Sequence, residues 1–223
     1  MVLPDTGCCH DGTMASPDAP AATVFTSRFN RIIAVVIWVF DALVLGALLI
    51  GAQSDRALAF VPAAFVALFA WLALWRPNVE VSDARVRLLN VFRTIEVPWA
   101  ALIHVDTRYA LTLYTPGHRY AAWAAPAPGR TGTNIARRAE RRGTVGPAPR
   151  PDGTVRPGDL LASESGQAAY LVRDTWARLQ NADAIEAGVA ESTPVSVRWH
   201  WLSGGALVLL ALGSLAALTA LRL

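Results

Sequence analysis

The sequence contains no lysine, and all 20 of its basic residues are arginine. Charge is scarce as well, because Asp, Glu, Lys and Arg make up 17% of the chain whereas hydrophobic residues make up 53%. Arginine without lysine, together with abundant Ala, Gly and Pro, favours a bacterium with a high-GC genome. The mean hydropathy of +0.35 exceeds that of ordinary soluble domains, so the apolar excess indicates segments in lipid.

Cysteine is nearly absent, since only Cys8 and Cys9 occur, and adjacent cysteines do not form a disulfide framework. Together with His10 they offer three soft ligands, but a tetrahedral zinc site needs a fourth ligand and wider spacing. His104 and Asp106 share one face of an expected strand about 7 Å apart, with no nucleophile or metal partner nearby. We therefore predict no metal, no cofactor and no enzymatic activity.

Residues 1–27 show no periodic apolar pattern and predict a disordered tail. Translation beginning at Met14 is an alternative to Met1, in which case Cys8 and Cys9 belong to an annotation artefact. Nothing in this segment predicts a binding site.

Two long apolar runs predict a transmembrane hairpin over 28–76, with spans at 32–52 and 57–75. At about 1.5 Å per residue, each run crosses most or all of a hydrocarbon core of roughly 30 Å. A cleaved signal peptide competes for the first run, but the polar leader before it is too long. A third run at 201–221 predicts a C-terminal span within 198–223.

Tryptophan and arginine cluster at the ends of these spans, as expected at a headgroup boundary. The predicted interfacial anchors are Trp71, Trp75, Arg76, Arg198, Trp199 and Trp201. Most arginines fall on one side of the spans, and only Arg56 and Arg222 fall on the other. The positive-inside rule then predicts a bacterial inner-membrane protein whose N-terminus and central region are cytoplasmic and whose C-terminus is outside.

One carboxylate, Asp41, interrupts the first span near its middle, where a charged group is costly. Protonation, a hydrogen bond to Ser214 in the third span, or a polar group of another protein are three ways to compensate. We expect Asp41 to contribute to helix packing or to partner association. Gly213 and Ser214 belong to a stripe of small residues in the third span that suits close helix packing.

Between the spans, residues 77–191 change from helical to strand-type alternation. Short runs such as Val79–Val81, in which apolar and charged residues alternate, predict half-buried antiparallel strands. The segment 164–181 predicts an amphipathic helix that places Ala168 and Val172 on its apolar face. We therefore predict an α+β membrane protein with three transmembrane helices and an antiparallel β-barrel or sandwich closed by a C-terminal helix.

Residues 131–157 form a Gly- and Pro-rich insert that predicts a flexible segment. Its arginines near an anionic leaflet would each contribute about 1 kcal/mol to attraction. A solvated loop is the alternative interpretation, and nucleic-acid binding is not predicted because no aromatic platform is interleaved. The candidate membrane-surface residues are Arg85, Arg87, Arg137, Arg138, Arg141 and Arg142.

Three segments carry a family resemblance: the run from Arg76 to Val81, the sequence NVFRTIEVPWAAL, and Trp123 to Arg130. They resemble the bacterial pleckstrin-homology-like (PH-like) domain of small actinobacterial membrane proteins, and the order of two spans, domain and last span also matches. The resemblance implies a PH-like barrel without assigned catalytic residues. Phosphoinositide-binding PH domains place basic residues in the first strand-to-strand loop, whereas here that loop is Ser82–Ala84.

Two functions are consistent with these features. The first is a membrane-anchored binding or scaffold module that recruits or regulates a protein partner, or that self-associates through its spans. The second is a sensor of anionic lipid or of the membrane surface, acting through the barrel and the arginine-rich insert.

Overall fold

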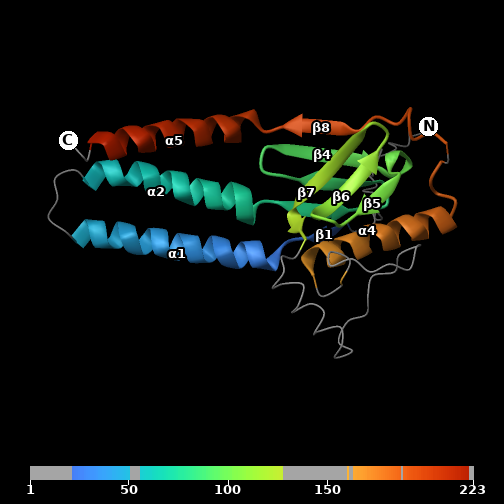
Figure 1. Ribbon diagram of the computed structural model, residues 1–223, viewed down its shortest axis with the longest axis horizontal. Helices are drawn as coiled ribbons and strands as arrows, with labels where there is room; N and C mark the ends of the chain where they lie inside the picture. Colours follow the sequence, from blue (N-terminus) through green and yellow to red (C-terminus); the bar gives the residue numbers. More distant parts are fainter. Residues whose placement is uncertain (1–21, 51–55, 128–159, 161–162, 187, 221–223) are drawn as a thin grey trace, which may run out of the picture.

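The computed structural model describes residues 22–50, 56–127, 160, 163–186 and 188–220 (Figure 1). The elements before the second sheet are β1 (Thr23–Phe25), α1 (Arg28–Ile50), α2 (Arg56–Ala70), the π-helical turn η1 (Trp71–Trp75), β2 (Asn78–Val81), β3 (Arg85–Leu89), β4 (Arg93–Pro98) and the 3-10 turn η2 (Trp99–Ala101). They are followed by β5 (His104–Asp106), β6 (Ala110–Thr115), β7 (His118–Pro126), α4 (Glu164–Asn181), β8 (Ser196–Trp199) and α5 (Trp201–Ala220).

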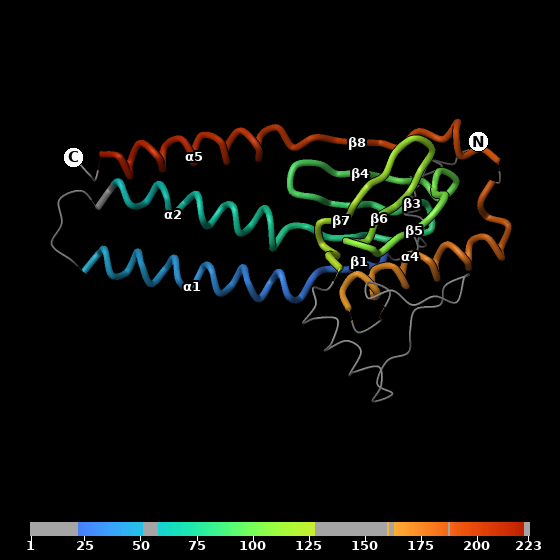
Figure 2. The backbone as a smooth tube through the Cα atoms, viewed as in Figure 1, coloured from blue at the N-terminus to red at the C-terminus, as the bar shows by residue number. Residues whose placement is uncertain are grey.

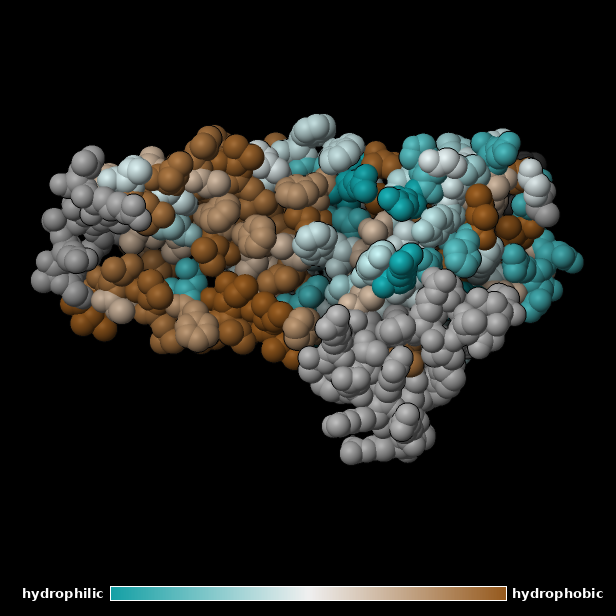
Figure 3. Space-filling view, in the orientation of Figure 1, coloured by the Kyte–Doolittle hydropathy of each residue, from teal (hydrophilic) through white to brown (hydrophobic). Residues whose placement is uncertain are grey.

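Three helices are long and apolar enough to span a membrane: Arg28–Ile50, Leu58–Trp75 and Trp201–Ala220. They lie side by side in the order α1, α2, α5 and extend to one side of the strands (Figures 1 and 2). The hydrophobic surface in Figure 3 lies over these helices, whereas hydrophilic residues gather over the strands. The predicted spans at 32–52, 57–75 and 201–221 therefore correspond to helices, although α1 begins four residues earlier than predicted.

Small residues allow α5 to approach α2 closely. A Cβ atom added at Gly213 would lie 3.1 Å from Cγ1 of Val61, so a larger side chain there would push the helices apart. Ser214 and Ala217 are also buried, whereas Gly205 faces open space. The predicted small-residue stripe thus packs between helices at Gly213, Ser214 and Ala217 only.

The larger sheet has five antiparallel strands in the order β1-β2-β3-β4-β8. Its central strands alternate as predicted, with Val79 and Val81 buried between more exposed neighbours. Pro98 ends β4, where the missing N–H of proline does not interrupt the ladder. Both edge strands lead directly into apolar helices, since β1 precedes α1 and β8 precedes α5.

The two edge strands differ from the predicted domain boundaries. Residues 1–21 of the predicted tail lie outside the described residues, but Thr23–Phe25 pair with β2 instead of belonging to a disordered tail. Ser196–Trp199 pair with β4, so the sheet extends beyond the predicted limits of 77–191. Strands of three and four residues with mostly exposed side chains are too short to show a clear period in the sequence.

The smaller sheet is antiparallel with the order β5-β6-β7, and it lies across β2 and β3 of the larger one. Strands β6 and β7 form a hairpin, and Gly117 occupies the left-handed region (φ 73°) at its turn. The described strands form two separate sheets, so the antiparallel architecture is confirmed but the predicted barrel is not seen to close.

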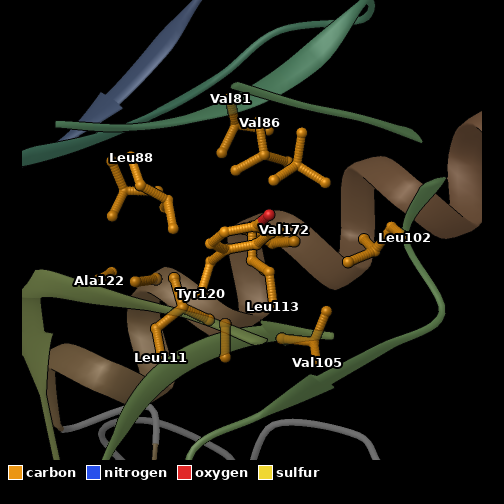
Figure 4. Close-up of a cluster of buried hydrophobic side chains, with 14 of the residues drawn as sticks. Val81, Val86, Leu88, Leu102, Val105, Leu111, Leu113, Tyr120, Ala122 and Val172 are labelled. Carbon is orange, nitrogen blue, oxygen red and sulfur yellow. The ribbon is translucent and has the colours of Figure 1, made fainter. Parts of the chain in front are cut away.

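Helix α4 covers the space between the two sheets. It begins and ends at the predicted residues, and Ser163 caps it by accepting a hydrogen bond from the Gly166 amide. Figure 4 shows Leu88 of the larger sheet, Leu113 of the smaller sheet and Val172 of α4 pointing toward one another. All three side chains are fully buried, so strands and helix share one core.

Truncation of a core side chain should cost far more than the same change at the surface. Ile95 is fully buried, whereas Ile103 is 55% exposed. We expect Ile95→Ala to lower the free energy of unfolding by about 2–5 kcal/mol and Ile103→Ala by less than about 1 kcal/mol. Chemical denaturation of the full-length protein in detergent, followed by circular dichroism, measures the difference. Equal effects would contradict the assigned core.

Candidate functional site

The strands meet the apolar helices at three junctions, and the first joins α4 to the start of α1. Ser27 Oγ accepts a hydrogen bond from the Asn30 amide (2.9 Å) and donates one to Glu164 Oε2 (2.6 Å). The other carboxylate oxygen, Oε1, accepts from the Phe29 amide (2.9 Å). An acidic group at a helix N-terminus is favourable because it satisfies free amides and complements the helix dipole. Glu164 of α4 therefore completes the cap of α1.

The second junction lies at the end of η1. The Trp123 indole Nε1 of β7 donates a 2.6 Å hydrogen bond to the carbonyl oxygen of Ala73, one of the last carbonyls of this helix. Asn90, in the turn between β3 and β4, holds the strand in place: its Oδ1 accepts from the Trp123 amide and its Nδ2 donates to the Ala121 carbonyl. The smaller sheet is thereby attached to the end of the second span.

The third junction surrounds His200, the single residue between β8 and α5. Its amide donates to the Phe92 carbonyl (2.8 Å), and its Nε2 lies 2.9 Å from Thr94 Oγ1. The Nη2 atom of Arg76 lies 3.4 Å from both ring nitrogens, which places the guanidinium against the imidazole rather than in one directed hydrogen bond. His200 therefore links the end of η1 and the start of α5 to β4.

Positive charge surrounds this histidine. Burial, followed by the charges of Arg76, Arg198 and Arg87, lowers the pKa of His200 below its ordinary value of 6.5. Burial also lowers the pKa of Arg76, which nevertheless keeps its charge. His200 is therefore neutral at pH 7, and protonation would bring a further positive charge into this junction.

The predicted interfacial anchors gather around the junctions. Arg76 lies over the Trp71 ring at 5.9 Å, and Trp199 stacks on Trp201 at 5.8 Å between ring centroids. The guanidinium carbon of Arg31 lies 5.1 Å from the centroid of the Trp75 ring. These rings remain partly exposed at the helix ends, as residues at a headgroup boundary do. Sequence reasoning missed Trp38, which packs on Trp75 and donates its indole N–H to the Ala67 carbonyl.

Arg85 and Arg87, predicted to face anionic lipid, lie in a row of ion pairs across the larger sheet. Arg87 contacts Glu80 at 3.4 Å and Glu96 at 3.5 Å, and Arg85 contacts Glu96 at 3.4 Å. Because Glu80 and Glu96 lie directly opposite Arg87 in the ladder, the register itself brings the charges together. Two glutamates offset the charges of these two arginines. Their predicted lipid contact stays a prediction.

The first strand-to-strand loop, Ser82–Ala84, lies at the end of β2 that is remote from the apolar helices, because β2 begins beside η1 and runs away from it. Asp83 in this loop pairs with Arg178 near the end of α4 at 2.5 Å. The loop therefore carries an acidic side chain that is engaged with the domain's own helix.

Asp41 and Ser214 are not joined. The Ser214 hydroxyl donates to the Leu210 carbonyl of its own helix, and the Asp41 carboxylate makes no hydrogen bond or ion pair among the described residues. Asp41 is half-buried on the side of α1 that carries Trp38 toward α2. The proposed pairing between the two residues is therefore not formed, and α2 places no polar side chain beside Asp41.

Two other groups of predicted residues remain separate from the junctions. The arginines of the insert lie outside the described residues: Arg137, Arg138, Arg141 and Arg142. His104 packs against the ring of Tyr114 on the smaller sheet. Within the described ranges, no group of three His, Cys, Asp or Glu side chains is arranged to hold a metal ion.

A groove of about 350 Å³ opens between the first junction and the second. Its walls come from the first turn of α1, the end of η1, and strands β6 and β7. The lining residues are Asn30, Leu74, Ala110, Ala121, Ala122, Trp123 and Pro126. Sequence reasoning did not find this groove, because it depends on bringing together segments that are far apart in the sequence. The only signal was Trp123, which opens one of the resemblance segments.

A small antiparallel domain with a covering C-terminal helix lies between apolar helices in this chain. Residues 76–159 match the family model for the bacterial PH domain, and the chain therefore contains a bacterial PH domain. The match begins directly after η1 and includes β2 to β7, and apolar helices precede and follow it. Comparisons with curated proteins and with solved structures found no match. The predicted resemblance is confirmed.

The indole hydrogen bond at the second junction should contribute measurably to stability. We expect Trp123→Phe to lower the free energy of unfolding by about 1 kcal/mol, because the Ala73 carbonyl loses its partner. Trp199→Phe is the matched control, since Trp199 is 53% exposed, close to the 54% of Trp123, and its indole makes no hydrogen bond in the described chain. Thermal unfolding in detergent measures both. An equal shift in the two variants would show that ring size alone matters.

The third junction should weaken at acidic pH. Because the folded-state pKa of His200 is lowered, its contribution to stability is fully present above about pH 6.5 and is lost as the pH falls through the folded value. We expect the melting temperature to drop between about pH 7.5 and 5.5 by more in the wild type than in His200→Gln. The exposed His118→Gln is the control and should behave as the wild type does. A parallel pH dependence in wild type and His200→Gln would rule out this role.

Proposed function

We propose that this chain is a membrane-anchored binding module whose bacterial PH domain is held at the inner face of the bacterial cell membrane and binds a protein partner there. The observation that carries the proposal is the direct continuity between the domain and the apolar helices. Only Thr26 and Ser27 separate β1 from α1, only Arg76 and Pro77 separate η1 from β2, and only His200 separates β8 from α5. Such short connections leave no linker along which the domain moves away from the helix ends.

Exposed apolar surface supports membrane insertion. In the most apolar 18-residue window of α1 only 6% of residues are buried, and in α5 only 17%. Side chains such as Leu209 (71% exposed) and Phe40 (64% exposed) would be unfavourable in water over so large a surface, whereas lipid accommodates them. The three helices therefore have the surface of spans, not of a soluble bundle.

The arginines support the proposed sidedness. Arg28, Arg31, Arg76 and Arg198 all occur at the helix ends that adjoin the sheets. By the positive-inside rule this end, with the PH domain, is cytoplasmic, and the C-terminus is outside.

A protein partner fits the domain surface better than a layer of anionic headgroups does. Arg85 and Arg87 are offset by glutamates, and the acidic loop Ser82–Ala84 lies at the end of the domain farthest from the helices. Exposed side chains suited to a protein contact occur elsewhere on the domain, at Ile103 (55%) and Tyr170 (42%). The competing function, a sensor of anionic lipid, would depend on the arginines of the insert.

Site-specific photo-crosslinking in native membranes tests the partner. The full chain is needed, because a fragment limited to 78–191 would lack both edge strands of the larger sheet. A photoreactive phenylalanine analogue replaces Ile103 or Tyr170, and the control position is the exposed Leu209 of α5. We expect one protein adduct of the same mass from both domain positions and none of that mass from Leu209.

The headgroup sensor makes the opposite prediction. In that case the two domain positions give no protein adduct, and binding of the arginine-rich insert to vesicles rises with anionic lipid and falls with salt. That result would contradict the proposed binding of a protein partner and support the lipid sensor instead.

A further inference from the structure

The groove between the first and second junctions lies where the domain meets the apolar helices. Asn30 stands in the first turn of α1 and Leu74 in the last turn of η1, while Ala110, Ala121 and Trp123 come from the smaller sheet. Its volume of about 350 Å³ falls within the range of about 300–1,000 Å³ that is typical of small-molecule sites. Beyond this turn α1 continues as exposed apolar surface, beginning with Ile32 (63% exposed). The groove and the lipid-facing surface are thus close to one another.

Asn30 is the single polar side chain in this otherwise apolar lining. The residue is 7% exposed, and its backbone amide is satisfied by Ser27. Its side-chain amide makes no hydrogen bond within the described part of the chain. The amide atoms are not sealed off from solvent, so they are open to the groove, where water or a ligand oxygen can pair with them. The amide offers both a donor and an acceptor to the groove.

The charge beside the groove is positive. Arg28 and Arg31 flank Asn30 in the same helical turn, and the Arg31 guanidinium lies over the Trp75 ring next to Leu74. Arg28 is exposed and has no ion pair among the described residues. Glu164, the carboxylate at the start of α1, is already engaged by Ser27 and by the Phe29 amide. An apolar groove with one amide and two adjacent guanidinium groups complements a phosphate ester that carries a hydrocarbon chain.

We propose that the groove binds one glycerophospholipid of the same leaflet. One acyl chain lies against Leu74, Ala121 and Trp123, an ester or phosphate oxygen accepts a hydrogen bond from the Asn30 amide, and the phosphate faces Arg28 and Arg31. The site rests on the membrane insertion described under the proposed function but does not depend on a protein partner. A lipid in this position bridges α1 and the smaller sheet, which no side-chain hydrogen bond joins directly in the described part of the chain.

A photoactivatable phospholipid tests this site. The full-length protein is reconstituted into phosphatidylcholine nanodiscs that contain a lipid with a diazirine in one acyl chain and a phosphatidylglycerol headgroup. Ala121 is exposed, so Ala121→Phe fills the groove without disturbing the core, and Asn30→Leu replaces the amide by an apolar side chain of similar shape. The matched control is Ala84→Phe, at an exposed position in the loop remote from the helices. Adducts are mapped by peptide mass spectrometry.

We expect wild type and Ala84→Phe to form adducts on peptides of β6–β7 that carry the groove. In Ala121→Phe and Asn30→Leu these adducts should fall by about tenfold, while adducts on α1, α2 and α5 stay unchanged. Unchanged span adducts and an unchanged melting temperature show that each variant is folded and inserted. If span adducts are present but groove adducts are missing or equal in all four proteins, the lipid site is wrong while membrane insertion stands. Loss of all adducts from the wild type overturns both.

Discussion

The structure depends on a difference in spacing between strands and helices. Hydrogen-bonded strands lie about 4.8 Å apart, whereas packed helices lie about 8–10 Å apart. The neighbouring strands β1 and β2 are each joined to an apolar helix: β1 leads into α1, and α2 leads through η1 into β2. The two helices must therefore spread apart as they leave the sheet. β2 and β8 have two strands between them, and the helices attached to them, α2 and α5, must converge instead.

Each junction accommodates part of this difference. The π-helical turn Trp71–Trp75 widens the end of the second span just before β2 begins. Gly213 lets α5 approach Val61 of α2, which the convergence of these helices requires. Glu164 reaches the start of α1 from α4, a helix outside both sheets. The polar contacts therefore occur where backbone geometry alone cannot hold helices and strands together.

The sequence predicted the helices and strands in which apolar and polar residues alternate regularly over many positions. The alternation of Val79, Val81 and Val86 with charged residues predicted the central strands, and the apolar stripe of α4 predicted its buried face. The edge strands were missed because three or four residues carry almost no periodic signal. The groove and the cap by Glu164 join segments distant in sequence, so no local pattern predicted them.

The arginines show where sequence reasoning about charge reaches its limit. A count of Arg85 and Arg87 suggested a positive surface, but antiparallel register places Glu96 beside both. Arg76 and His200 lie 124 positions apart, and yet the Arg76 charge adds to burial in lowering the pKa of the histidine. The surface charge of this domain therefore depends on which residues the strand pairing brings together, and a count of charges along a segment does not predict it.

The position of β8 at the edge of the larger sheet has a consequence for biosynthesis. A ribosome makes the chain from the N-terminus, so β4 is synthesised about 100 residues before β8. Until Ser196–Trp199 are available, the backbone hydrogen-bonding groups on one edge of β4 have no partner strand. By then both helices of the N-terminal hairpin have been synthesised. An unpaired strand edge attracts other chains, and the strand that covers it is also the one that leads into the last span. Completion of the larger sheet therefore waits for the strand that leads into α5, and any chain that stops before Ser196 leaves the ribosome with an open sheet edge.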